Sequence, residues 1–233
     1  TDDIAPAKAS GRVHPVSVEF RDLGFVHHGS RDPVFEGFNL HIAPGEHVAL
    51  LGPSGSGKST LLALLAGLAE TRHGRILVDD VTLDDANAAE LRTRMAWIGQ
   101  NPHLFAGSIA GNIRLHRDDI SRDAIAAALK LASLDHVAEA HGNAMIGENG
   151  AGLSGGEALR LTLARAAANR SAGLIIADEP TAHLDHRTAS DITEALLTLA
   201  SGRTLIVATH DPVLAGRMDR IIRLNEGFRE VAR

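Results

Sequence analysis

The stretch "GPSGSGKSTLLALLAGL" occupies residues 52–68 and changes abruptly from glycine and serine to a run of leucines. Glycine is costly inside a helix and leucine is favourable there, so we expect a loop that gives way to a helix at Lys58. The preceding segment "HVALL" (residues 47–51) is short, apolar and partly β-branched, which predicts a buried strand. The predicted order is therefore strand, glycine-rich loop, helix.

This order is the context that the phosphate-binding pattern G-x-x-x-x-G-K-[ST] requires, and Gly52, Gly57, Lys58 and Ser59 fit that pattern. Small residues allow successive backbone N–H groups to point at phosphate oxygens, and the helix N-terminus adds partial positive charge. Lys58 can reach the β- and γ-phosphates, and the Ser59 hydroxyl can ligate Mg²⁺. The alternative is an ordinary turn rich in glycine and serine. The predicted nucleotide-binding loop comprises Gly52, Pro53, Ser54, Gly55, Ser56, Gly57, Lys58, Ser59 and Thr60.

Bulk composition narrows the class of protein. The chain has 233 residues, no cysteine and a formal net charge of −6, which does not favour nucleic acid as a partner. Its longest apolar run, residues 61–68, is much shorter than the ~20 residues of a membrane span. Residues 1–15 are polar, contain two prolines and resemble a linker, and the chain begins without Met, so we expect a piece of a longer protein.

Strands and helices alternate through most of the chain, which predicts a parallel sheet covered by helices on both faces. Residues 16–28 have alternating strand character, "GLIIADEP" (173–180) is an apolar strand that ends in two acids, and Trp97 is expected in the core. Apolar residues recur at helical spacing from Asp118 to Ala140. We therefore interpret residues 103 to about 159 as a mainly helical insertion.

Polar side chains follow three of the predicted strands. Ligands bind outside the carboxyl ends of strands in an open parallel sheet, so Asp178 is expected near the phosphate loop as a Mg²⁺ ligand. Glu179 would activate the attacking water, and His210, after "LIVAT", would contact the γ-phosphate. Gln100 could join the Mg²⁺ and water shell. The alternatives are a pair of solvated acids for Asp178 and Glu179, a structural role for His210 and an exposed polar cap for Gln100.

"LSGGE" (residues 153–157) precedes another predicted helix and so forms a second potential anion-binding N-terminus. One γ-phosphate does not need two such sites from one subunit. A dimer in which each chain completes the site of the other explains the second motif, whereas a simple serine N-cap is the alternative.

Taken together, these motifs resemble the nucleotide-binding domain of ABC transporters over nearly the whole chain. The order is that of the family: phosphate loop, Q-loop Gln100, signature 153–157, Walker B segment 174–178, Glu179, D-loop 182–185 and switch His210. The resemblance implies an α/β fold, with a RecA-like P-loop NTPase core, an N-terminal antiparallel β subdomain and the inserted α-helical subdomain. Residues 16–233 would form this ATPase domain.

The family resemblance also assigns roles to residues outside the phosphate loop. Ser154 and Gly156 would bind ATP of the partner domain, and Asp185 would cross the dimer interface. The family usually stacks adenine on an aromatic residue, often Tyr, where this chain has His27; imidazole offers less stacking surface, and His28 is a second candidate. The signature set is Leu153, Ser154, Gly155, Gly156 and Glu157.

The segment "NPHLFAGSIAGNIRL" (residues 101–115) resembles the exporters of this family. That resemblance implies a membrane domain fused upstream, a second ATPase domain, identical or not, and a place on the cytoplasmic face of the inner membrane. "IGQNPHLFAGSI", "DEPTAHLD" and "ATHDPVLAGRMDRIIRL" resemble the CydD-type exporters of cysteine or glutathione that support cytochrome bd assembly. A lipid, peptide or drug exporter, a soluble DNA-repair or translation ATPase, and a binding module without activity are the alternatives.

Overall fold

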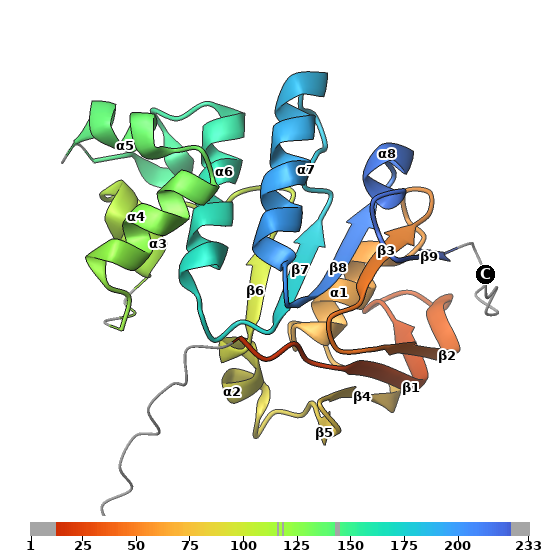
Figure 1. Cartoon of the computed structure of the whole chain (residues 1–233). Helices are drawn as coiled ribbons and strands as arrows, with labels where there is room; N and C mark the ends of the chain where they lie inside the picture. The colour runs from red at the N-terminus through yellow and green to blue at the C-terminus, as the bar shows by residue number, and fades with distance from the viewer. Residues whose placement is uncertain (1–12, 116, 118, 143–144, 225–233) are drawn as a thin grey trace, which may run out of the picture.

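The computed structural model describes residues 13–115, 117, 119–142 and 145–224. Two sheets and a group of helices make up this part of the chain (Figure 1). Most of the predicted linker, residues 1–15, lies outside the described residues. Among the described helices, we find none with the length and apolar character needed to cross a bilayer.

The central sheet has five parallel strands in the order β6-β7-β8-β3-β9. Its middle strands are apolar along their length and buried on both faces, as a parallel sheet between helices requires. Its strands are β3 (His47–Leu51), β6 (Met95–Ile98), β7 (Leu174–Asp178), β8 (Thr204–Thr209) and β9 (Arg220–Arg223).

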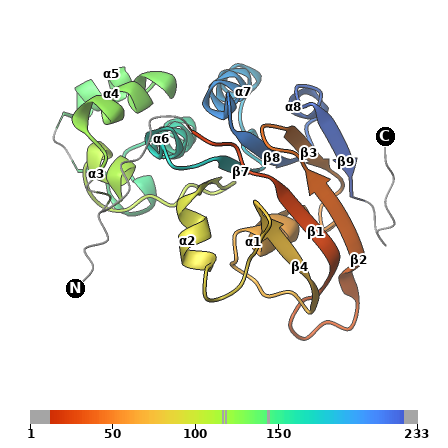
Figure 2. The same cartoon turned by 60° about the horizontal axis from the view of Figure 1, so that its bottom comes forward.

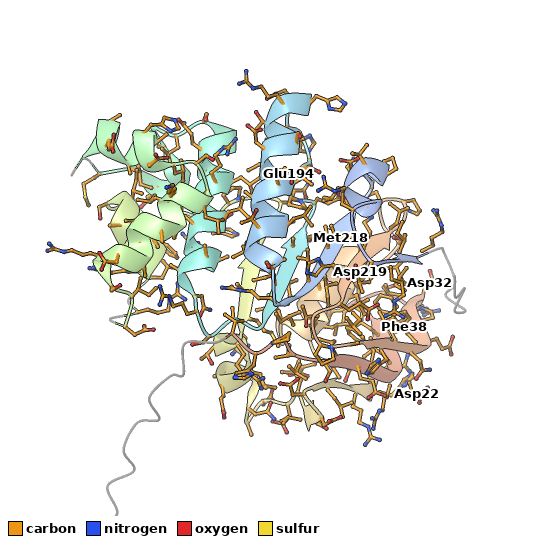
Figure 3. The ribbon with its side chains drawn as sticks, viewed as in Figure 1. Asp22, Asp32, Phe38, Glu194, Met218 and Asp219 are labelled. Carbon is orange, nitrogen blue, oxygen red and sulfur yellow. The ribbon has the colours of Figure 1, made fainter. Side chains whose placement is uncertain are left out.

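An antiparallel sheet in the order β2-β1-β4-β5 packs beside the central sheet. Helix α1 (Lys58–Leu65) lies between the two sheets (Figure 2) and shares one buried cluster with apolar residues of both. Phe38 lies inside this cluster (Figure 3), with its ring 5.8 Å from that of Phe20 and 5.3 Å from that of Phe35. The strands are β1 (Val18–Val26), β2 (Pro33–Ile42), β4 (His73–Val78) and β5 (Val81–Thr82).

Helices α3 to α8 share a buried cluster on the other face of the central sheet, whereas α2 lies on the side of α1 (Figure 2), where its Leu91 joins the α1 cluster. Helix α6 packs against α3, α4, α7 and strand β6, so it joins the helical group to the core. The helices are α2 (Ala88–Thr93), α3 (Ile109–Arg114), α4 (Arg122–Leu131), α5 (Asp135–His141), α6 (Gly155–Ala168), α7 (His186–Ala200) and α8 (Pro212–Ala215), with a 3₁₀ turn η1 at Glu148–Gly150.

The α/β fold with an antiparallel β subdomain is confirmed, and three details differ from the sequence interpretation. The helical pattern from 118 to 140 is divided between α4 and α5, because the chain turns at Ser133, whose φ is 53°. Helix α6 begins at Gly155, so the proposed boundary near 159 falls inside one helix. Trp97 was expected in the core but is 39% exposed, because β6 is an edge strand with only one strand neighbour.

Candidate active site

The sheet topology gathers the predicted site residues at one edge. The phosphate loop follows β3, the two acids follow at the end of β7, His210 follows β8, and Gln100 comes two residues after β6. Parallel strands present their carboxyl ends at the same edge, and the helices that connect them begin there. In Figure 1, β7 and β8 point to the end of the molecule at which α6 and α7 begin.

Two glycines of the phosphate loop are required by close packing. A Cβ atom at Gly52 would lie 2.3 Å from the carbonyl oxygen of Leu224. Gly57 has a φ of 92°, and a Cβ atom there would lie 2.8 Å from Val34 and Phe35. The sequence therefore folds this loop tightly against β9 and the antiparallel sheet, because glycine occupies both positions.

Lys58 is buried at the start of α1, and its ammonium group faces the loop. Its Nζ donates to the carbonyl oxygens of Gly52 and Pro53, at 2.7 and 3.0 Å. The same Nζ lies 3.8 Å from Oε1 of Glu179. The lysine thus links the phosphate loop to the acid that follows β7.

Ser59 and Asp178 form a second contact between the loop and β7. The Ser59 hydroxyl donates to Oδ1 of Asp178 at 3.0 Å. Burial raises the pKa of Asp178, and the nearby Glu179 raises it further, whereas the Ser59 hydrogen bond and Lys58 act in the opposite direction. A hydroxyl and a partly desolvated carboxylate therefore face each other beside the phosphate loop.

Glu179 is held between a lysine and a histidine. Its Oε2 accepts hydrogen bonds from the backbone N–H of His210 at 3.3 Å and lies 2.8 Å from Nδ1 of that residue. The Glu179 side chain is 13% exposed and that of His210 is 69% exposed. Glu179 has a φ of 48°, in the left-handed region that residues other than glycine seldom adopt.

These contacts surround a cavity of about 590 Å³. The phosphate loop forms one side of it, and Glu179, His210 and Gln100 form another. Ser56 of the loop is buried, whereas Gly52 and Pro53 face Lys58 through their carbonyl groups. The lining residues are His27, Ser54, Gly55, Gly57, Lys58, Ser59, Thr60, Gln100, Glu179, Ala182, His183 and His210.

His27 reaches this cavity from the end of the antiparallel sheet, one residue after β1. Its Nε2 lies 3.5 Å from Oγ1 of Thr60, and the Phe25 ring packs edge-on against its imidazole at 5.0 Å. The fold thus brings His27 to the phosphate loop, although the two are far apart in the sequence.

The signature residues do not line the cavity. Ser154 caps α6. Its hydroxyl accepts from the Glu157 N–H at 3.3 Å, and Oε2 of Glu157 accepts from the Ser154 backbone N–H at 2.7 Å, which completes a capping box. Gly155 and Gly156 form the first turn of α6, and Leu153 packs beside the helical cluster. As the sequence indicated, this segment precedes a helix, α6.

Asp185 is likewise placed at a helix N-terminus and outside the cavity. Its Oδ1 accepts from the N–H groups of Arg187 and Thr188, both at 3.0 Å, and its Oδ2 accepts from the Thr188 hydroxyl at 2.6 Å. The hydrogen bonds from Thr188 lower the pKa of the Asp185 carboxyl. Ala182 and His183 also line the cavity. The sequence placed both in the D-loop, but it gave a role only to Asp185 of that loop.

A glycine loop after β3, acids at the end of β7 and a histidine after β8, all on one edge of a parallel sheet, define a P-loop nucleotide triphosphatase fold. A family model described as "ABC transporter" matches residues 35–182. The chain is 38% identical over 229 residues to the ATP-dependent lipid A-core flippase of Chromobacterium violaceum, covering 97% of this chain and 38% of that protein. The chain therefore belongs to the ABC transporter family, as an ATPase domain that binds ATP.

The names of other relatives refer to other transported molecules. The chain is 34% identical over 220 residues to the mycobactin import ATP-binding/permease protein IrtB of Mycobacterium tuberculosis, covering 93% of this chain and 38% of that protein. It is 35% identical over 213 residues to the glutathione/L-cysteine transport system ATP-binding/permease protein CydC of Escherichia coli, covering 91% of this chain and 37% of that protein.

A solved structure supports the fold assignment. A bacterial Atm1-family ABC exporter with ATP bound superposes with a TM-score of 0.82 at 32% identity, covering 97% of this chain and 40% of that one. The chain thus spans less than half the length of the relatives it matches.

Proposed function

We propose that this domain hydrolyses MgATP between two ABC ATPase domains and so powers an exporter. The observation that carries the proposal is the continuous line of contacts from the phosphate loop through Lys58 and Glu179 to His210. These contacts bring a lysine ammonium group, a carboxylate and an imidazole to one cavity, which supports the proposal. Phosphoryl transfer requires mainly such positioning and charge neutralisation.

The phosphate loop would hold the nucleotide phosphates through its backbone N–H groups and through Lys58, which would exchange its contacts with Gly52 and Pro53 for phosphate oxygens. His27 would stack on the adenine. In that case His27→Ala weakens ATP binding several-fold and His27→Tyr strengthens it. Equal affinity in an equilibrium binding assay of all three forms would assign the base to another residue.

Ser59 and Asp178 fit Mg²⁺, because it prefers oxygen ligands and commonly takes one or two carboxylates together with substrate phosphates. Among the described residues, no cluster of three or more His, Asp or Glu side chains is arranged to hold a metal. The donor set therefore suits an ion that arrives with the nucleotide, and Gln100 lines the same cavity. When bound, Mg²⁺ would neutralise phosphate charge.

Glu179 would act on the attacking water. Its carboxylate is held by His210 on one oxygen and lies near Lys58 on the other, so it has a fixed direction. From that position it would orient the water and accept its proton as the oxygen approaches the γ-phosphorus. His210 would position the same carboxylate and contact the γ-phosphate with its exposed ring.

Glu179→Gln tests this assignment, since the amide keeps the size of the side chain and loses the base. The variant should bind ATP as the wild type does and hydrolyse it at least ~100-fold more slowly. Phosphate release and equilibrium binding measure the two effects separately, and Lys58→Ala serves as a control that should lose binding. Wild-type turnover in Glu179→Gln would remove Glu179 from the mechanism.

The partners follow from the relatives, two of which are named ATP-binding/permease proteins. We propose a transmembrane domain on the same polypeptide, joined through residues 1–15, with the helical subdomain at 103–159 in the ATPase domain. A second ATPase domain would complete the site with Ser154, Gly156 and Asp185. The assembly would lie on the cytoplasmic face of the inner membrane.

The transported substrate is proposed to be cysteine or glutathione, as in CydD-type exporters. The resemblance of residues 98–109, 178–185 and 208–224 to those proteins motivates this proposal, and the similarity to a glutathione/L-cysteine transport protein supports it. The lipid A-core flippase, at 38% identity compared with 35% for the glutathione/L-cysteine transport protein, makes a lipid exporter the competing candidate.

Inverted membrane vesicles that contain the native full-length protein and its partner distinguish these candidates. They should accumulate labelled cysteine or glutathione when ATP is supplied, and Lys58→Ala should abolish the uptake. Vesicles that ignore both thiols and move a lipid would overturn the thiol assignment and leave the ATPase assignment unchanged.

A further inference from the structure

His183 lines the nucleotide cavity, yet it has no part in the hydrolytic steps described above. It lies in the loop between Glu179 and α7 and faces the cavity together with Lys58, Ser59 and His210. A neighbouring cavity of about 450 Å³ between this loop, α7 and α8 is lined by His183 as well. The imidazole therefore stands at the boundary between the phosphate site and the adjoining surface.

The loop that carries His183 has an unusual backbone. Glu179 and His183 both have φ in the left-handed region, at 48° and 62°. The N–H groups of Ala182 and Leu184 donate to the carbonyls of Glu179 and Thr181. Directly afterwards, Asp185 caps α7. The loop is thus fixed at both ends, and a non-glycine residue is kept in a conformation that L-residues seldom adopt.

The His183 side chain is exposed, and no hydrogen bond joins it to another residue within the described ranges. This differs from His210, which is bound to Glu179 through Nδ1. Both ring nitrogens of His183 are therefore available to a ligand, on a backbone that is already ordered. An imidazole N–H is a suitable donor to a phosphate oxygen, and such a bond to a charged acceptor is stronger than one between neutral groups.

We propose that His183 binds the terminal phosphate of the nucleotide held by the same chain and so makes the site prefer ATP to ADP. This inference rests on the proposed function, because it requires the nucleotide phosphates to lie in the cavity between Lys58 and Glu179. The ligand class is a nucleoside triphosphate, and the role is discrimination by the last phosphate. His183 acts separately from the water activation assigned to Glu179.

The test is the ratio of the dissociation constants for MgADP and MgATP, measured by titration calorimetry on the domain under conditions in which it binds as a monomer. His183→Ala should weaken MgATP binding about tenfold and MgADP binding less than twofold, because only ATP has the phosphate concerned. His186→Ala is the matched control, since His186 lines the neighbouring cavity and not the nucleotide cavity. It should leave the ratio unchanged.

A second variant separates the side chain from the backbone. His183→Gly removes the imidazole but accepts a φ of 62° without strain, so it should show the same loss of ATP preference as His183→Ala. Wild-type preference in His183→Gly would mean that the backbone, and not the imidazole, is responsible, and this would overturn the inference. An unchanged ratio in His183→Ala would overturn it too, with ATP binding intact. A wild-type domain that binds neither nucleotide would instead overturn the nucleotide site itself.

Discussion

At the scale of the residue, the site places a carboxylate where burial opposes its charge. Asp178 ends a buried strand, and burial is the main reason why its pKa is raised. Its partner, Ser59, is a neutral hydroxyl, and it only partly offsets the loss of water. This arrangement stabilises the ligand-free domain less than a neutral side chain would, and it suits a site that a cation completes.

Asp178→Asn should therefore raise the thermal stability of the nucleotide-free domain at neutral pH by a few degrees and abolish Mg²⁺-dependent hydrolysis. A raised pKa means that the folded chain holds the proton more tightly than the unfolded chain does. Stability is thus lost as pH rises from the ordinary value of 3.8 to the raised pKa, and the loss stays constant above it.

Calorimetric or fluorescence melting in the presence of a chelator measures the difference in melting temperature between Asp178→Asn and wild type. The gain of Asp178→Asn over wild type should shrink as the pH falls toward 4, because the wild-type carboxyl then takes up its proton. A variant that melts below wild type at neutral pH would show that the charged form of Asp178 stabilises the fold.

At the scale of the element, three helices begin at serines that cap them in the same way. Ser108, Ser121 and Ser154 each accept a hydrogen bond from the N–H group three residues later, at the starts of α3, α4 and α6. Only Ser154 belongs to a full capping box, through Glu157. The serine of the signature therefore has a structural role in its own chain in addition to the role proposed at the partner's nucleotide.

Ser154→Ala should destabilise the domain by about 1 kcal/mol, because the first turn of α6 loses its side-chain acceptor. Ser121→Ala removes an equivalent cap from α4, whose serine accepts from Ala124 at 3.1 Å, and should cost a similar amount. Urea unfolding measures both. A Ser154→Ala variant as stable as wild type would show that the capping box contributes little to folding.

The sequence predicted the elements whose patterns are strong and local. The strand, loop and helix around Lys58 were predicted because glycine and leucine have opposite helix preferences, and the ends of β7 and β8 were predicted from apolar runs with polar termini. It did not predict α2, which is short and only partly buried, or the exposure of Trp97, because the order of strands in a sheet is set by long-range pairing. His183 was missed because its importance arises from a loop conformation and from a shared cavity, which no periodicity records.

At the scale of the whole molecule, the two segments proposed to bind phosphate begin at one edge of the sheet and do not meet. The phosphate loop and the signature helix both begin at that edge, because helices between parallel strands return to it (Figure 1). The cavity beside Lys58 includes none of residues 153–157. A second domain, turned to face the first, would bring its α6 to this cavity, and the nucleotide would then become part of the interface.

This arrangement predicts that association depends on ATP. The isolated domain should be mainly monomeric without nucleotide, and Glu179→Gln should form dimers with MgATP because it binds the nucleotide without consuming it. Light scattering on that variant measures the change in mass.

Ser154→Ala added to Glu179→Gln should prevent association, whereas Ser121→Ala, which removes a matched cap on α4, should leave it intact. Both serine variants are measured without denaturant and well below their melting temperatures. A similar loss of stability in both therefore cannot explain a difference in their association. If neither the domain alone nor a mixture with its native partner associates in MgATP, the role of Ser154 at a second nucleotide site is wrong, and the capping of α6 is its whole function.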